Sequence, residues 1–202
     1  MDQSQIYQPD QSLQVADNIF KTKINGLFFY QYKKHYDERG FFTEIAKVPH
    51  FNKAVVGVDF QPKQFNFSYS KTNVVRGFHA EDWNKMVTIV GGQAVCVLAD
   101  IRKNSPTYTQ VEYFLMGTDL ESEYGAGLFI SRGIANSICV LNGPVSYLYA
   151  VDMLYEDRDR TGDRAISLFD PQLNVQWPIP REKMIISQRD LDSVELNIKE
   201  AS

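Results

Sequence analysis

Apolar and aromatic residues recur along this chain in short runs, and turn-forming residues separate one run from the next. The runs are rich in β-branched and aromatic side chains, which favour strands over helices. None approaches the ~20 apolar residues that a membrane-spanning helix needs. The pattern predicts strands over residues 27–32, 55–60, 64–69, 74–79, 86–90, 93–101, 110–115, 127–130, 137–141 and 145–153.

The spacing of these runs predicts the fold class. Turns fall between them at nearly even intervals, which is typical of an all-β sandwich or barrel. Gly91 and Gly92 predict a tight hairpin between the two runs that flank them. Near the end of the chain, Ser187 is a suitable cap for a short helical segment that contains Asp190.

The length of 202 residues fits one principal domain. Residues 1–23 are mostly polar and are predicted to form an N-terminal arm, residues 24–190 the β domain, and residues 191–202 a tail. The mixed charges of residues 156–164 predict a solvated loop.

Composition and charge exclude several classes of protein. With 44% hydrophobic and 23% charged residues, the chain is expected to be globular rather than disordered. A net charge of −4 argues against a nucleic-acid partner, so an anionic ligand needs a local basic cluster. The first residues lack the pattern of a secretory signal, and a cytoplasmic location without membrane contact is therefore expected.

Histidine is scarce, which argues against a metal held by imidazoles. Of the three histidines, His79 stands out because it ends a strand run and Lys85 begins the next run after a short loop. Hairpin geometry would bring both side chains to one mouth. Strict alternation puts Arg76 and His79 on opposite faces, so a bulge or bend at Gly77 is needed to bring both into one pocket. The alternative is a strand-end histidine in an ordinary hydrogen-bond network.

Two stripes of side chains accompany this candidate. In residues 64–70, polar and aromatic side chains alternate, and the polar face is either solvated or lines a pocket. Tyr147 and Tyr149 also share a face, and each hydroxyl needs a partner if it is buried.

Several motifs follow one another in a recognisable order between about Leu27 and Asp190. They are Asp37-Glu38-Arg39-Gly40-Phe41-Phe42-Thr43-Glu44, Gln64-x-Asn66-x-Ser68-x-Ser70-x-x-Asn73-Val74-Val75-Arg76-Gly77-Phe78-His79, Lys85-Met86-Val87, Asp100-Ile101-Arg102-x-x-Ser105-Pro106-Thr107-Tyr108, Phe169-Asp170-Pro171 with Trp177-Pro178, and Ser187-x-x-Asp190. In order and spacing, these motifs resemble the dTDP-4-dehydrorhamnose 3,5-epimerase family, whose members act on nucleotide-linked 4-keto-6-deoxy sugars. The resemblance implies an all-β fold of the cupin-type double-stranded β-helix (jelly roll) with a short C-terminal helical segment.

The resemblance also implies roles for individual residues. His79 resembles the catalytic base, Asp190 the carboxylate that orients it, and Lys85 the lysine that stabilises an enolate oxygen. Tyr149 resembles the tyrosine that delivers a proton on the far side of the sugar. The implied assembly is a homodimer without metal or other cofactor, in which the partner chain contributes to each nucleotide site. Residues that resemble the nucleotide and diphosphate ligands are Arg39, Glu44, Gln64, Asn66 and Arg76.

Four departures from the family pattern concern the walls of the site. Asn136 stands where the family has a second histidine, Ala150 replaces a lysine, and Leu154-Tyr155 replaces a pair of tyrosines. The stretch Glu81-Asp82-Trp83 replaces a glutamine-containing sequence. We retain Asn136 and Tyr155 as candidate substrate-binding residues.

The predicted function is epimerisation of a nucleotide-diphospho-4-keto sugar at C3, C5 or both, through an enolate. A ketoisomerase on the same substrate class and a non-catalytic sugar-nucleotide or carbohydrate-binding jelly roll are the alternatives.

Overall fold

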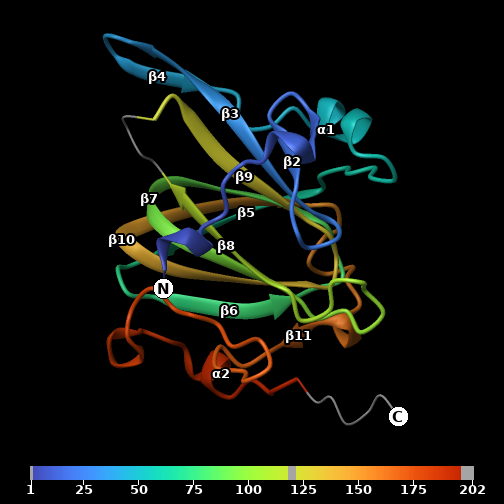
Figure 1. The fold of residues 1–202 in the computed structure, drawn as a ribbon, viewed down its shortest axis with the longest axis vertical. Coiled ribbons are helices and arrows are strands. Elements are labelled where there is room, and N and C mark those ends of the chain that lie inside the picture. The colour runs from blue at the N-terminus through green and yellow to red at the C-terminus, as the bar shows by residue number, and fades with distance from the viewer. Residues whose placement is uncertain (1, 118–121, 197–202) are drawn as a thin grey trace.

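Two long strands, β7 (Lys85–Asp100) and β10 (Ile134–Val151), organise the computed structural model, which describes residues 2–117 and 122–196. They pair antiparallel along their whole length, from Lys85 opposite Val151 to Asp100 opposite Ile134. Each bends midway and continues from one layer of the molecule into the other (Figure 1). The remaining described strands are β1 (Gln14–Ala16), β2 (Ile19–Lys21), β3 (Leu27–Asp37), β4 (Gly40–Thr43), β5 (Gln64–Ser70), β6 (Val75–Ala80), β8 (Val111–Gly117), β9 (Tyr124–Ile130) and β11 (Arg164–Ala165).

The bends divide the strands into the two layers of a jelly roll. The first half of β7 pairs with β9, while its second half pairs with β8. In the same way, β10 pairs with β6 in its first half and with β5 in its second. Large side chains such as Phe29, Phe114 and Leu98 fill the space between the layers. The predicted all-β cupin-type jelly roll is confirmed, and the short C-terminal helix is α2 (Gln188–Leu191), capped by Ser187.

The predicted hairpin at Gly91 and Gly92 is wrong, because these residues form the bend inside β7. Gly92 has a φ of +74°, and a Cβ there would lie 2.8 Å from the carbonyl oxygen of Asn142 in the matching bend of β10. Two glycines therefore allow two paired strands to bend together, rather than letting one strand reverse.

The predicted strand over residues 55–60 is also wrong. A helix that the sequence did not reveal, α1 (Val48–Ala54), ends there, and the chain continues through a turn. The side chain of Asn52 bonds both backbone groups of Phe60, with distances of 3.0 Å to the nitrogen and to the oxygen. These bonds take the place of the hydrogen bonds between paired strands. Phe51, Val55 and Phe60 are buried together in one small hydrophobic core.

Residues near both ends of the chain pair with the rest of the fold. Strands β1 and β2 lie within residues 1–23 and extend the sheet beside β3. Val194, in the expected tail, forms an isolated parallel bridge with Ile166. Residues 197–202 of that tail lie outside the described residues.

Strand β6 contains a bulge at Gly77, as predicted for Arg76 and His79 to share one pocket. Arg76 lies opposite Ile138, and His79 lies opposite Asn136, so three steps on β6 match two on β10. Gly77 lies in this bulge with a φ of +121°, and a Cβ would lie 2.7 Å from the carbonyl oxygen of Asn136. The bulge turns Arg76 and His79 toward the same side of the strand.

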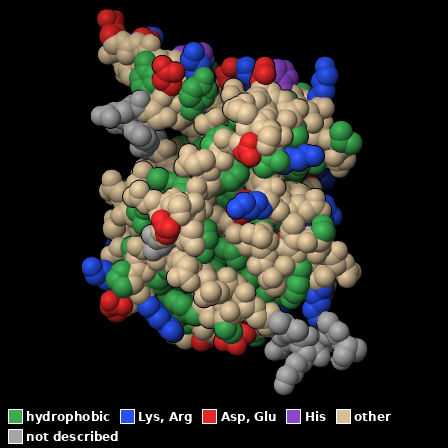
Figure 2. All heavy atoms as spheres, viewed as in Figure 1, with side chains coloured by type: hydrophobic (Ala, Val, Ile, Leu, Met, Phe, Trp, Pro, Cys, Tyr) green, Lys and Arg blue, Asp and Glu red, His purple; other side chains and the backbone are tan. Residues whose placement is uncertain are grey.

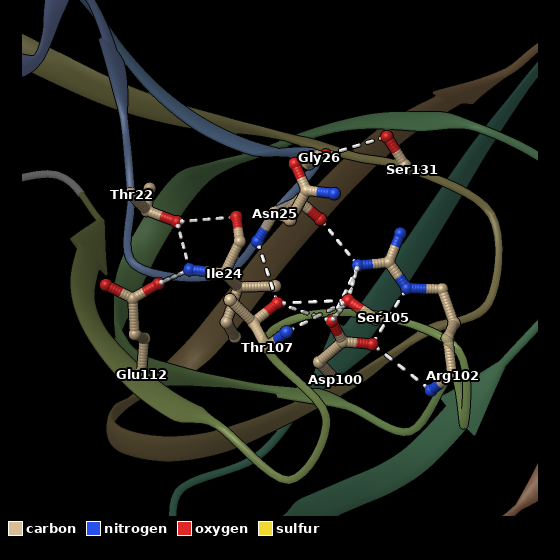
Figure 3. Close-up of polar contacts among 10 residues, drawn as sticks. All are labelled: Thr22, Ile24, Asn25, Gly26, Asp100, Arg102, Ser105, Thr107, Glu112 and Ser131. Carbon is tan, nitrogen blue, oxygen red and sulfur yellow. Dashed lines mark hydrogen bonds and ion pairs between the residues drawn. The ribbon is translucent and has the colours of Figure 1, made fainter.

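A buried carboxylate holds together the loops at one end of the barrel (Figure 3). Asp100 accepts hydrogen bonds from the guanidinium and backbone of Arg102 and from the hydroxyls of Ser105 and Thr107. Burial alone would raise the pKa of Asp100, but these hydrogen bonds together outweigh it and lower the pKa below its usual value. Arg102 also donates to the carbonyl oxygen of Asn25, which ties the loop before β3 to the same cluster.

The face of the molecule drawn in Figure 2 carries no single dominant charge. Figure 2 shows acidic and basic side chains dispersed over one face, with apolar side chains between them. Within the described residues, no helix has the length and apolar character to cross a membrane.

We predict that Asp100→Asn lowers the free energy of unfolding by about 2–4 kcal/mol at pH 7, because charged hydrogen bonds inside the protein are lost. Since the folded-state pKa is lowered, this stabilisation is complete above the unfolded pKa of about 3.9 and is lost as the pH falls through the folded value. Urea unfolding should therefore show the largest difference from wild type at neutral pH and a smaller one below about pH 4. The exposed Asp59→Asn is the control, and an equal effect of both variants would contradict the prediction.

We predict that Gly77→Ala costs about 2–4 kcal/mol of unfolding free energy, because alanine fits neither the positive φ nor the close contact with β10. Gly91→Ala is the control, since its φ is ordinary and its nearest neighbour, Ser146, lies at 3.4 Å. Denaturant unfolding compares the two. Equal stability of both variants would show that the bulge at Gly77 does not need glycine.

Candidate active site

A histidine and an aspartate that are far apart in the sequence meet at the surface of β6. The Nε2 atom of His79 lies 2.7 Å from Oδ1 of Asp190 on α2. The side chain of Asp190 is only 5% exposed, whereas that of His79 is 28% exposed. The backbone N–H of Gly77 donates to the second carboxylate oxygen at 3.4 Å, so two groups of β6 hold the carboxylate. The Nε2 edge of the imidazole is thus held by Asp190, and the rest of the ring is partly accessible.

The accessible side of His79 borders a cavity of about 190 Å³ between β5, β6, β7 and β10. The bulge at Gly77 brings Arg76 into the same cavity. Most of the residues singled out by the sequence therefore lie together, with Asp190 behind them. The lining residues are Ser68, Arg76, His79, Glu81, Lys85, Asn136, Ile138, Tyr147 and Tyr149.

Lys85 does not face the cavity as an isolated cation. Its ammonium Nζ lies 2.5 Å from Oε2 of Glu81, and both side chains are largely buried. The sequence marked Glu81 only as part of a divergent stretch, and its contact with Lys85 was not predicted. Glu81 and Lys85 are four residues apart and lie on either side of the β6–β7 turn. That spacing, with opposite charges, could have suggested the ion pair. The ion pair fixes the ammonium beside His79 and offsets its charge.

Tyr149 lies on the wall formed by β10, opposite Asn66 of β5. Burial raises the pKa of Tyr149, the negative charge of Glu81 raises it further, and Arg158 and Arg76 partly oppose the shift. The phenol is therefore protonated at neutral pH, which suits a proton donor.

Asn136, which takes the place of the family's second histidine, bonds to the tyrosine beside Tyr149. Its Nδ2 donates to the hydroxyl of Tyr147 at 3.3 Å, and the rings of Tyr147 and Tyr149 lie 5.7 Å apart. The amide thus helps to fix the tyrosine wall of the cavity.

The polar stripe of β5 faces inward, so the pocket-lining interpretation is the one that holds. Ser70 accepts a hydrogen bond from Nε of Arg76 at 2.9 Å. At the other end, Gln64 donates to Asn66 at 2.7 Å and accepts from the backbone N–H of Tyr155 at 2.9 Å. Asn66 and Tyr155 line a second cavity, which adjoins the first.

The structure does not bring Arg39 and Glu44 to either of these cavities. Arg39 lies in the turn of the β3–β4 hairpin, which projects from one end of the molecule, and Glu44 directly follows β4 (Figure 1). Arg39 is paired with Asp37 at 2.5 Å, and Glu44 is paired with Lys47 at 2.7 Å. Within one chain, these two candidates cannot join the others.

The loop after β10 is mostly exposed, as predicted for residues 156–164, with an exception at Arg158. The side chain of Arg158 is only 9% exposed and pairs with Asp163 at 2.6 Å. The sequence did not reveal the burial of Arg158, because Trp83, one of the two aromatic residues that cover it, is distant in sequence. Among the described residues, no group of three or more His, Cys, Asp or Glu side chains is arranged to hold a metal.

Comparisons with known proteins agree with this geometry. Residues 21–197 match the family model of dTDP-4-dehydrorhamnose 3,5-epimerase. The chain is 31% identical to the enzyme of that name from Shigella flexneri, over 87% of this chain and 93% of the relative. It is 30% identical to a dTDP-4-dehydrorhamnose 3-epimerase from Streptomyces niveus, over 86% of this chain and 81% of the relative.

Solved structures show the same fold. A crystal structure of dTDP-6-deoxy-D-glucose-3,5-epimerase from Legionella pneumophila, in complex with dTDP-4-keto-L-rhamnose, matches with a TM-score of 0.79. It is 29% identical and covers 90% of this chain and 93% of that chain. The family match spans the His79–Asp190 pair and the whole cavity beside it, and the chain therefore belongs to the dTDP-4-dehydrorhamnose 3,5-epimerase family.

Proposed function

We propose that this protein epimerises a nucleotide-diphospho-4-keto sugar at C3, C5 or both, and that His79 is the catalytic base. The observation that carries the proposal is the 2.7 Å contact between His79 and Asp190 at the wall of a cavity that also holds Lys85 and Tyr149. A non-catalytic binding module has no need for a braced base beside a cation and a phenol.

The proposed reaction begins at the hydrogen next to the C4 ketone. His79 takes this proton, and the electron pair of the C–H bond forms the enolate. If the carbon acid is weaker than imidazolium by about ten pKa units, the transfer costs about 14 kcal/mol, at about 1.4 kcal/mol per unit. The base alone cannot supply this free energy, so the charge that develops on oxygen must be stabilised.

Lys85 is the group proposed to stabilise that oxygen. Its ammonium is buried in the cavity and held by Glu81. As the enolate forms, the ammonium gains a second negative partner without leaving the first, because a lysine ammonium has three donors. Asp190 fixes the tautomer of His79 and stabilises the imidazolium after proton transfer.

Tyr149 is proposed to complete the inversion. Its hydroxyl donates a proton to the opposite face of the enolate carbon, and the phenolate then regains a proton from solvent. Since the pKa of Tyr149 is raised, the phenolate is a strong base and does not accumulate. Gln64, Asn66, Arg76, Asn136 and Tyr155 are proposed to bind the substrate.

The number of inverted centres follows from isotope uptake. We predict that the protein, incubated in deuterated water with nucleotide-linked 4-keto sugars, introduces two deuterons if C3 and C5 both react and one if a single centre reacts. Mass spectrometry measures the uptake. Movement of the keto group in the product would indicate the ketoisomerase alternative, and no exchange over a broad panel would contradict the proposal and leave a binding protein.

His79→Ala should reduce this exchange by about 10²–10⁴-fold, because a positioned base is lost, while nucleotide affinity changes by no more than a few fold. His50→Ala, an exposed histidine on α1, is the control. Full exchange by the His79 variant would remove that residue from the role of base.

We also propose a homodimer in which each chain completes the partner's site. Strand β5 pairs only with β10 among the described strands, and its outer face exposes Phe65, Phe67 and Tyr69. Burying such a stripe against a second copy is favourable. A partner's hairpin would also supply Arg39 and Glu44, which lie away from the cavities of their own chain. The cytoplasmic location and the absence of a cofactor stay predictions.

We predict that Phe67→Glu converts the dimer to a monomer, because a charge replaces an aromatic ring that is 61% exposed on the single chain. Sedimentation at micromolar concentration measures the mass. Val56→Glu, an exposed apolar residue after α1, is the control and should leave the dimer intact. A monomeric wild-type protein would contradict the proposed assembly.

A further inference from the structure

A second cavity, of about 300 Å³, adjoins the first across His79, Glu81 and Tyr149. Its outer wall is made by residues that have no part in the proposed reaction. Trp83 lies in the turn between β6 and β7, in the stretch where this chain departs from the family pattern. Arg158 lies in the segment after β10. Its guanidinium stacks 4.6 Å from the ring centre of Trp83 and 4.3 Å from that of Tyr155.

Three buried nitrogen atoms of residues around this cavity find no acceptor among the described residues. They are Nε1 of Trp83, Nε of Arg158 and Nδ2 of Asn66. Indole and guanidinium N–H groups can only donate. The amide of Asn66 is oriented by its neighbours, because the backbone N–H of Tyr155 engages the oxygen of Gln64 and leaves the Gln64 nitrogen to face Asn66 Oδ1. All three unpaired groups are therefore donors.

Unpaired buried donors are rare, because each costs about 1–3 kcal/mol. Three of them lie around one cavity beside His79 and favour a ligand that accepts hydrogen bonds, while Oδ1 of Asp163 adds one buried acceptor to the same wall. A group with several oxygen acceptors would pair with these donors after small side-chain movements and would recover that free energy. An apolar group or a second donor would not.

The charges around the cavity favour the same kind of ligand. Arg158, Arg164 and Arg189 are part of its wall. The two carboxylates there are already paired, Glu81 with Lys85 at 2.5 Å and Asp163 with Arg158 at 2.6 Å. The remaining positive charge attracts anionic or strongly polarised oxygen atoms.

We propose that this cavity binds oxygen atoms of the nucleotide sugar other than those at the reacting carbons, and that Trp83 and Arg158 are substrate-binding residues. The inference rests on the proposed function, because the cavity shares His79 and Tyr149 with the reacting site. Such oxygen atoms come from the diphosphate or from hydroxyl groups on the sugar. The divergent turn that carries Trp83 thus contributes to substrate selection.

Two conservative variants test the proposal. Trp83→Phe keeps an aromatic ring and removes one N–H, while Arg158→Lys keeps the charge and removes Nε. Arg181→Lys is the matched control, since Arg181 stacks on Phe169 at 3.9 Å outside the cavity. Calorimetry at fixed salt measures binding of dTDP, UDP and GDP and of their glucose conjugates, and the pair that wild type binds best is compared across variants. Thermal unfolding checks that each variant is folded.

We expect each cavity variant to weaken binding of the glucose conjugate by about tenfold, with no change in the control. Equal weakening for the free diphosphate supports the diphosphate as the source of the oxygen atoms, and weakening for the conjugate alone supports the sugar hydroxyls. Affinities within twofold of wild type in both variants overturn the proposal, as does wild type that binds none of the probes.

The isotope-exchange assay separates this inference from the proposed function. If wild type shows no exchange but the two variants lose affinity, the reaction is wrong and the binding role stands. If exchange proceeds and the affinities are unchanged, the binding role alone is wrong. In an active enzyme, Trp83→Phe should raise KM and leave kcat near the wild-type value, which a general loss of structure would not do.

Discussion

The contact between His79 and Asp190 is the interaction on which the arrangement of the site depends. A carboxylate that is 5% exposed is costly unless it is bonded, and Asp190 is bonded to the His79 ring and to the backbone of β6. Its own backbone N–H donates to the Ser187 hydroxyl, which begins α2. A shift of α2 would break several of these bonds at once. The helix and the strand therefore fix each other, and the imidazole keeps one orientation toward the cavity.

The carboxylates that border the cavities are each paired with a cation, and arginine side chains are in excess. Glu81 accompanies Lys85, Asp163 accompanies Arg158, and Asp190 accompanies His79. Arg76, Arg164 and Arg189 also border the cavities, which explains how a chain with a net charge of −4 forms a site for an anionic substrate. The field of the whole molecule does not attract the ligand, and a few desolvated donors beside His79 must do so. Each pair also keeps its cation in place, because a paired buried charge has fewer positions of low energy than a free one.

Much of the fold and of the site could be predicted from local patterns. Alternation in residues 64–70 predicted one polar face, either solvated or lining a pocket, and the structure shows that it lines the pocket. Alternation also showed that Arg76 and His79 could share a pocket only with a bulge or bend at Gly77, and β6 has that bulge. The features that could not be predicted depend on distant partners. Gly91 and Gly92 bend rather than reverse the chain because β10 bends beside them. Residues 55–60 are apolar as a strand would be, but they pack against α1 and bond to Asn52.

The candidate site residues also divide into those that local patterns predicted and those that depend on distant partners. Turn length predicted that His79 and Lys85 would meet at one mouth, whereas the role of Tyr149 was implied by the family resemblance. His79 follows the bulge in β6, and Lys85 and Tyr149 lie on the paired strands β7 and β10. Trp83 and Arg158 come from segments without periodicity, and only folding brings them together. Arg39 and Glu44 match the family motif, but in the single chain they border neither of the two cavities that the other candidates line.

The position of Asp190 along the chain has a consequence for the order in which the site is assembled. The two members of the pair are 111 residues apart, and the barrel strands that carry the imidazole and the cavity all precede α2. On the ribosome, the barrel is able to close before α2 has been synthesised. An incomplete polypeptide would then have a shaped pocket and a histidine without its carboxylate. The base would therefore gain its orienting carboxylate only once α2 docks against β6.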